Sequence, residues 1–131
     1  MDDHVKLRAG VRRLLEATRD MLVVGEAGDG IEALELVERL EPDIVLLDVE
    51  MPRMNGLQVV QEIAARHKNV KPLALSAYDD RQYILGMLDQ GAVGYLIKDE
   101  APEMLVEAIR EISHSNRRWI SKRVQHLIEN G

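Results

Sequence analysis

Three polar residues that end or follow short apolar runs, together with two acids near the start of the sequence, are of the types that phosphoryl chemistry requires. They are Asp2, Asp3, Asp48, Ser76 and Lys98. Three carboxylates gathered in one place would repel one another unless a cation joined them, and oxygen ligands suit Mg²⁺. A lysine and a hydroxyl can bind the remaining oxygens of a phosphoryl group. Together these residue types indicate phosphoryl transfer to a carboxylate at a magnesium site.

Each of these residues also has an ordinary structural explanation when it is considered alone. Asp48 could cap the turn after a strand, and Asp2 and Asp3 could be acids placed favourably in the first turn of a helix. Ser76 alone is typical of a turn, and Lys98 alone is typical of a solvated surface. Only their joint placement favours chemistry. The four histidines show no metal-ligand spacing, so we assign them no role.

Their placement follows from an alternation of helical and strand-like patterns. Helical periodicity predicts helices over 5–18, 31–40, 57–67, 84–90 and 102–113, and apolar runs predict strands over 21–27, 43–48, 72–76 and 94–97. The run at 43–48 is apolar between two acids, which is typical of a strand covered on both faces, and we place it centrally. This order predicts an α/β fold with a flavodoxin-like, doubly wound parallel sheet. In such sheets ligands bind at the carboxyl ends of the strands, where the five polar residues fall.

Length and composition limit the possible functions. A chain of 131 residues is enough for one domain, and the absence of cysteine excludes disulfides and thiolate metal sites. The formal charge of −6 makes direct binding to DNA an unfavourable expectation. The sequence holds no apolar run of membrane-spanning length and starts with acids rather than a basic leader, so we expect a cytoplasmic protein without a membrane partner.

Four motifs in order resemble the receiver domain of two-component response regulators, whose fold is called CheY-like. They are the acidic pair at 2–3, the strand 44–48 followed by 51–56, the step at 75–77, and the segment 94–98. The resemblance covers residues 2 to about 113. It implies a phosphoprotein in which Asp48 accepts a phosphoryl group from a sensor histidine kinase and thereby switches a dimerisation or output surface in signal transduction.

The same resemblance implies the metal ligands. Asp3 and Asp48, together with the backbone carbonyl of Glu50, would hold Mg²⁺, and Asp2 would support this acidic pocket through water. Asp48 is therefore expected to be both the phosphorylated residue and a metal ligand.

Phosphoryl binding and switching are implied for three further residues. Lys98 and Ser76 would bind the phosphoryl oxygens, with Ser76 moving towards them while Tyr95 turns inward. Tyr95 has the equally plausible interpretation of a core tyrosine. The output surface would be formed by the fourth helix, the fifth strand and the fifth helix of the family's fold.

Two details are similar to the LuxR-type class, in which a receiver precedes a helix-turn-helix DNA-binding domain. Asp99 rather than proline follows Lys98, and the segment 24–30 follows the first helix. We expect a receiver domain over 1–113 and a linker or helix over 114–131, leading towards an effector domain that this sequence does not contain. Control of transcription, and any contact with DNA, would require that missing domain.

The amino terminus departs from the family, because the usual first strand would precede Asp2 and is expected to be absent here. Loss of a central strand would leave unpaired sheet edges, a state that favours a homodimer or a domain-swapped oligomer.

Two other functions remain open. An aspartyl phosphatase could use Asp48 as its nucleophile, but Glu50 stands where such enzymes need a general-acid aspartate. A binding or dimerisation module could keep the receiver fold without being phosphorylated. We expect no enzyme activity beyond slow self-dephosphorylation.

Overall fold

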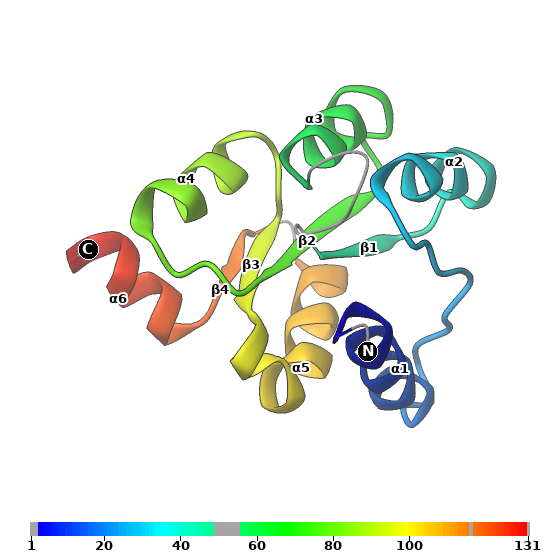
Figure 1. The fold of residues 1–131 in the computed structure, drawn as a ribbon, viewed down its shortest axis with the longest axis horizontal. Helices are drawn as coiled ribbons and strands as arrows, with labels where there is room; N and C mark the ends of the chain where they lie inside the picture. Colours follow the sequence, from blue (N-terminus) through cyan, green and yellow to red (C-terminus); the bar gives the residue numbers. More distant parts are fainter. Residues whose placement is uncertain (1–2, 49–55, 116, 131) are drawn as a thin grey trace.

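The computed structural model describes residues 3–48, 56–115 and 117–130, in which helices and strands alternate from α2 onwards (Figure 1). In chain order the elements are α1 (Asp3–Glu16), α2 (Gly30–Leu40), β1 (Ile44–Asp48), α3 (Gly56–Arg66), β2 (Lys71–Ser76), α4 (Arg81–Asp89), β3 (Gly94–Ile97), the 3-10 helix η1 (Lys98–Glu100), α5 (Ala101–His114), β4 (Trp119–Ile120) and α6 (Lys122–Asn130). In the part of the chain that the structure describes, no helix is long and apolar enough to span a membrane.

The strands form one parallel sheet in the order β1-β2-β3-β4. In this register Asp48 lies opposite Leu75, and Ser76 lies opposite Ile97. The carboxyl ends of β1, β2 and β3 therefore meet at one edge of the sheet, as the doubly wound fold requires.

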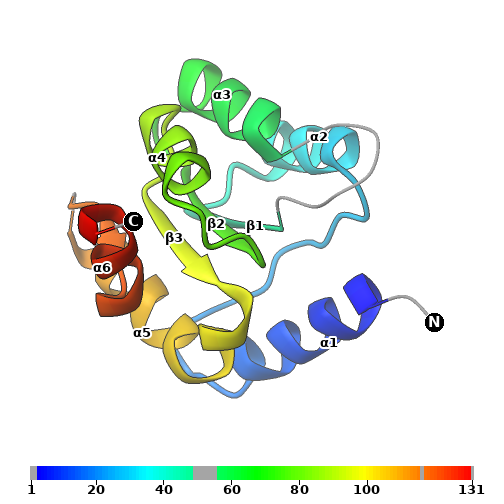
Figure 2. The ribbon, with the colours of Figure 1, turned by 60° about the vertical axis from the view of Figure 1, so that its left-hand side comes forward.

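Helices cover both faces of the sheet, so the fold is doubly wound as predicted (Figure 2). Leu47, Ala74 and Tyr95 point to one face and join a core with α2, α3, α4 and α6. The alternate residues Leu46 and Leu75 belong to a second core with α1 and α5 on the other face. The two-residue period of the strands thus distributes a continuous apolar run over two cores.

Helix ends follow local chemistry that is visible in the sequence. Asp29 caps α2, because its carboxylate accepts a hydrogen bond of 2.9 Å from the backbone N–H of Glu32. Pro102 lies in the first turn of α5, where its missing N–H does no harm. Gly91 has a φ of 123°, a conformation that favours glycine, and it closes the turn after α4.

The prediction of a strand over 21–27 is wrong. This segment forms no strand in the structure, and the side chains of Leu22 and Val24 are 84% and 51% exposed. A strand exists only by pairing, and among the described residues none is paired with this segment.

The central position predicted for 43–48 is also wrong, because a strand is central only when both of its edges pair with other strands. β1 is a strand, but within the described ranges β2 is its partner and its other edge pairs with no strand. Its residues are consequently less buried than those of β2 and β3.

The segment after α5, where a linker or helix is predicted, forms a short strand followed by a helix. β4 pairs with β3, and α6 packs against α4 and β3. Gly94 permits this approach, since a Cβ at that position would lie 2.6 Å from the carbonyl oxygen of Trp119.

Candidate functional site

The carboxyl edge of the sheet brings Asp48 and Lys98 together from strands that are not neighbours. Asp48 is the last residue of β1, and Lys98 directly follows β3, with β2 between them. The Nζ of Lys98 lies 3.3 Å from Oδ2 of Asp48. Their side chains are only 22% and 16% exposed, so this ion pair is partly desolvated while the carboxylate remains accessible. A carboxylate with a cation beside it is suited to accept a group that brings further negative charge.

Ser76 ends β2 at the same edge, and its side chain is fully buried. Its Oγ accepts a hydrogen bond of 3.0 Å from the backbone N–H of Tyr78, which fixes the start of the following loop. The serine therefore lies at the predicted edge while its hydroxyl holds the loop.

Tyr95 connects that loop to the core. Its ring is fully buried, and its hydroxyl donates a hydrogen bond of 2.8 Å to the backbone carbonyl of Tyr78. Burial raises the pKa of Tyr95 well above its ordinary value, because the phenolate would lose its hydration; a hydrogen bond with Ser76 lowers it in part. Tyr95 is thus a core residue, and its hydroxyl is also hydrogen-bonded to the loop after Ser76. Its burial agrees with the interpretation as a core tyrosine, and its contact with the loop is compatible with the predicted switching role.

An aromatic group around this loop was not foreseen from the sequence. The ring centroids of Tyr78 and Tyr83 lie 4.8 Å apart, and those of Tyr83 and Tyr95 lie 6.4 Å apart in an edge-to-face arrangement. The spacing of Tyr78 and Tyr83 in the sequence was the available signal, because the first turn of α4 places Tyr83 next to the loop.

The metal site is only partly described. Asp48 offers the oxygen donor that Mg²⁺ prefers, at the edge where ligands bind in this fold. The backbone of Asp3 begins α1, but its side chain lies outside the described residues, as do Asp2 and Glu50. Among the residues whose side chains are described, no group of three or more histidines, cysteines or acids could hold a metal ion. The Mg²⁺ ligand set therefore stays a prediction, with the donor chemistry of Asp48 in its favour.

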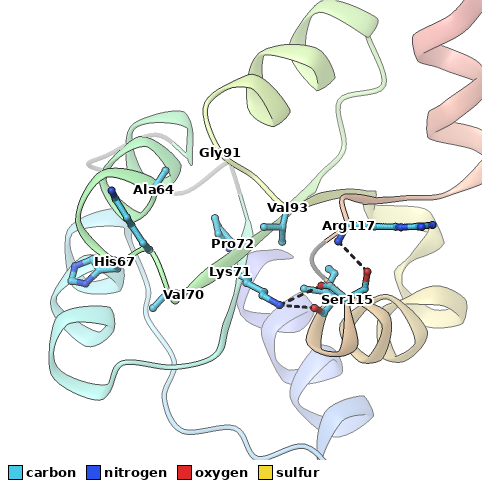
Figure 3. Close-up of a pocket in the computed structure, with 11 residues that line it drawn as sticks. Ala64, His67, Val70, Lys71, Pro72, Gly91, Val93, Ser115 and Arg117 are labelled. Carbon is cyan, nitrogen blue, oxygen red and sulfur yellow. Dashed lines mark hydrogen bonds between the residues drawn. The ribbon is translucent and has the colours of Figure 1, made fainter.

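A pocket of about 320 Å³ lies at the opposite edge of the sheet (Figure 3). It is lined by the end of α3, the start of β2, the residues just before β3 and the end of α5. Lys71 lies in it, with Nζ donating to the backbone carbonyl oxygens of Ile112 at 2.9 Å and Ser115 at 3.4 Å. Lys71 thus caps the carboxyl end of α5, a structural role. The pocket is remote from Asp48, so we do not place the function there.

Comparison with known proteins identifies the family to which this sequence is similar. A family model of the response regulator receiver domain matches residues 1–110. The transcriptional regulatory protein DegU of Brevibacillus brevis is 37% identical over 126 residues, which cover 96% of this chain and 53% of DegU. The nitrate/nitrite response regulator protein NarL of Escherichia coli is 39% identical over 111 residues, which cover 85% of this chain and 51% of NarL. The chain spans about half the length of the curated relatives it matches.

Solved structures agree with this result. The signal receiver domain of the response regulator NarL from Mycobacterium tuberculosis has a TM-score of 0.82 at 38% identity, and the match covers 87% of this chain and 92% of that one. A LuxR-family two-component response regulator from Aurantimonas sp. has a TM-score of 0.90 at 33% identity, with coverage of 98% and 91%. The sequence resemblance to LuxR-type receivers is thus confirmed.

Proposed function

The chain belongs to the response regulator receiver domain family, and from this premise we propose that it is a phosphorylation-dependent switch whose phosphoacceptor is Asp48. The observation that carries this proposal is the contact of 3.3 Å between Lys98 and Asp48 at the carboxyl edge of the sheet. The donor is a phosphohistidine of a sensor histidine kinase. The family is a signalling family, and we propose no enzymatic turnover beyond slow self-dephosphorylation.

The transfer step balances with these groups. A carboxylate oxygen of Asp48 attacks the phosphorus atom, and a new P–O bond forms while the P–N bond to the imidazole breaks. The electron pair of that bond remains on the imidazole nitrogen, which takes up a proton. Lys98 orients the carboxylate before transfer and can then bind an oxygen of the new acyl phosphate.

A divalent cation would complete this site. Asp48, Asp3 and the backbone carbonyl of Glu50 would hold Mg²⁺, with Asp2 supporting the acidic pocket through water, and the ion would neutralise charge on the transferred group.

The response would begin at Ser76. If its hydroxyl turns to a phosphoryl oxygen, the hydrogen bond from the backbone N–H of Tyr78 is lost and the loop is released. That loop also accepts the hydrogen bond from Tyr95, so its movement would be transmitted to the buried ring.

The cellular role of the protein is proposed from its relatives, and its assembly is proposed from the sheet. Several relatives are named transcriptional regulatory proteins and are considerably longer than this chain, so we propose a cytoplasmic role in transcription control, with DNA contacted through a separate effector domain. Among the residues that the structure describes, one edge of β1 pairs with no strand, which supports a homodimer or a domain-swapped oligomer. Size-exclusion chromatography with light scattering, repeated over a range of concentrations, would test that assembly.

Phosphoramidate tests the transfer directly, because this small donor carries the same P–N bond as a phosphohistidine. With Mg²⁺, intact mass spectrometry should show one added phosphoryl group per chain, and the addition should be lost in Asp48→Asn. Asp43→Asn is the matched control, because Asp43 lies just before β1, at the end remote from Lys98, and should leave the addition intact. A folded wild-type chain that gains no group would refute the proposal and favour a binding module that works without phosphorylation.

A further inference from the structure

The pocket at the edge of the sheet remote from Asp48 combines cations with apolar walls (Figure 3). Its cationic side chains are Lys68, Lys71 and Arg117, and His67 lies among them. No aspartate or glutamate belongs to the described residues that line it. The chain as a whole carries a formal charge of −6, so this grouping runs against its overall charge. The pocket therefore has the local charge to attract an anion.

Lys71 has a hydrogen-bond donor that its structural role does not use. An ammonium group has three N–H donors. Those of Lys71 bind the carbonyl oxygens of Ile112 at 2.9 Å and Ser115 at 3.4 Å, and no further acceptor for them lies among the described residues. The carboxyl end of α5 carries only about half a negative charge, so it does not neutralise the lysine. The two carbonyls thus fix a charged donor at the wall of the pocket (Figure 3).

Lys68 and Arg117 supply further positive charge from exposed positions. The backbone N–H of Arg117 donates a hydrogen bond of 3.0 Å to Oγ of Ser115, which keeps the arginine backbone near Lys71. In Figure 3 the guanidinium extends away from Lys71, so the arginine side chain must turn before both cations meet one ligand. An exposed cation contributes little to binding, so we expect these two to strengthen the binding of an anion that Lys71 holds.

The walls beside Lys71 are apolar, and they decide the class of anion. Pro72 has no N–H, and the N–H of Val93 already donates to the carbonyl oxygen of Pro72 at 2.8 Å. The backbone N–H of Lys71 likewise donates to the carbonyl oxygen of Asp43 at 2.9 Å. Phosphate sites usually need several convergent backbone N–H groups, and these are already used. A ligand with one charge and an apolar body matches these walls better.

We propose that this pocket binds a small monocarboxylate with an apolar body, about the size of benzoate. Its carboxylate would lie at Lys71, and its apolar part would lie against Pro72 and Val93. The volume of about 320 Å³ is at the lower end of the range for small-molecule pockets. The site is separate from Asp48, and the inference does not depend on phosphorylation.

Benzoate is the probe that tests this site, titrated into the whole chain and followed by the NMR shifts of backbone amides. The largest shifts should occur at Lys71, Gly91 and Val93, which line the pocket, and should saturate with a Kd on the order of 1 mM. Benzamide keeps the ring without the charge, and acetate keeps the charge without the ring. Each should bind at least about fivefold more weakly than benzoate.

Substitutions separate the fixed lysine from the exposed cations. Lys71→Gln removes the charge but keeps an N–H donor for the end of α5, so the folded variant should lose benzoate binding. Lys68→Gln combined with Arg117→Gln should leave the fold intact and weaken binding about fivefold. Arg39→Gln combined with Lys122→Gln is the matched control, because it removes the same charges from exposed positions outside the pocket and should leave the Kd unchanged.

Three results would overturn the inference. They are the absence of saturable shifts at the pocket, equal binding of benzamide, and tighter binding of inorganic phosphate than of benzoate. An equal loss of affinity in the control pair would also overturn it, because overall charge would then explain the attraction. Asp48→Asn should bind benzoate like the wild type, so a failure of the proposed function would leave this result unchanged.

Discussion

Replacing Tyr95 by phenylalanine tests the buried hydrogen bond that joins the core to the loop after Ser76. The hydroxyl is fully buried and donates at 2.8 Å to the carbonyl of Tyr78. Such a bond contributes about 0.5–1.5 kcal/mol to the free energy of unfolding. Near pH 7, Tyr95→Phe should therefore lower that free energy by about 1 kcal/mol, or the Tm by about 3–6 °C.

The loss of stability caused by Tyr95→Phe depends on pH, and the burial of the hydroxyl fixes the sign of this dependence. The pKa of Tyr95 is raised in the folded state above the value of about 10 in the unfolded chain. Its contribution to stability is therefore complete below pH 10 and decreases above it, as the unfolded tyrosine ionises. The advantage of the wild type over Tyr95→Phe should fall by up to about 1.4 kcal/mol per pH unit and vanish between about pH 10 and 11.

Urea denaturation of both proteins at a series of pH values measures this difference. Tyr78→Phe provides the control, since its side chain is 49% exposed and the substitution should change the free energy of unfolding by less than about 0.5 kcal/mol near pH 7. A difference between wild type and Tyr95→Phe that stays constant from pH 7 to about pH 11 would refute the burial of the Tyr95 hydroxyl.

Three further substitutions test other parts of the structure. Lys98→Ala should leave the chain folded but reduce the phosphorylated fraction reached with phosphoramidate, because Asp48 loses its neighbouring cation; an unchanged fraction in intact mass spectra would argue against that role. Leu105→Ala should lower the free energy of unfolding by about 2–5 kcal/mol in urea titrations, because the side chain is fully buried, and a loss below about 1 kcal/mol would contradict the second core. Gly94→Ala should push β4 away and cost about 1–3 kcal/mol, and fluorescence of Trp119, the single tryptophan, should report the movement; an unchanged spectrum would contradict the close approach of the two strands.

The elements that the sequence predicted correctly are those governed by local pattern. The apolar run at 44–48 identified β1 because a strand buried on both faces needs apolar residues at every position. The helices predicted over 31–40 and 102–113 begin within one residue of α2 and α5, where Asp29 and Pro102 suit a helix start. The topology then placed Asp48 and Lys98 at one edge before any distance was known.

The elements that the sequence missed depend on distant partners. The segment 21–27 has the composition of a strand, but composition cannot supply the neighbour with which a strand must pair. β4 has only two residues, which is too short for a recognisable pattern, and it depends on the space left by Gly94. The contacts of Asp99 with Arg123 and of Glu100 with Ser121 join residues 24 and 21 positions apart, so spacing along one element could not reveal them.

The most direct measurement locates the phosphoryl group on the chain. Treatment with phosphoramidate and Mg²⁺, followed by borohydride, reduces an aspartyl phosphate to homoserine, and peptide mass spectrometry then identifies the converted residue. The arrangement of Asp48 beside Lys98 predicts conversion at Asp48 alone, at no more than one site per chain. Conversion at a different acid, or none in a folded sample, would contradict the assignment of Asp48 as the phosphoacceptor.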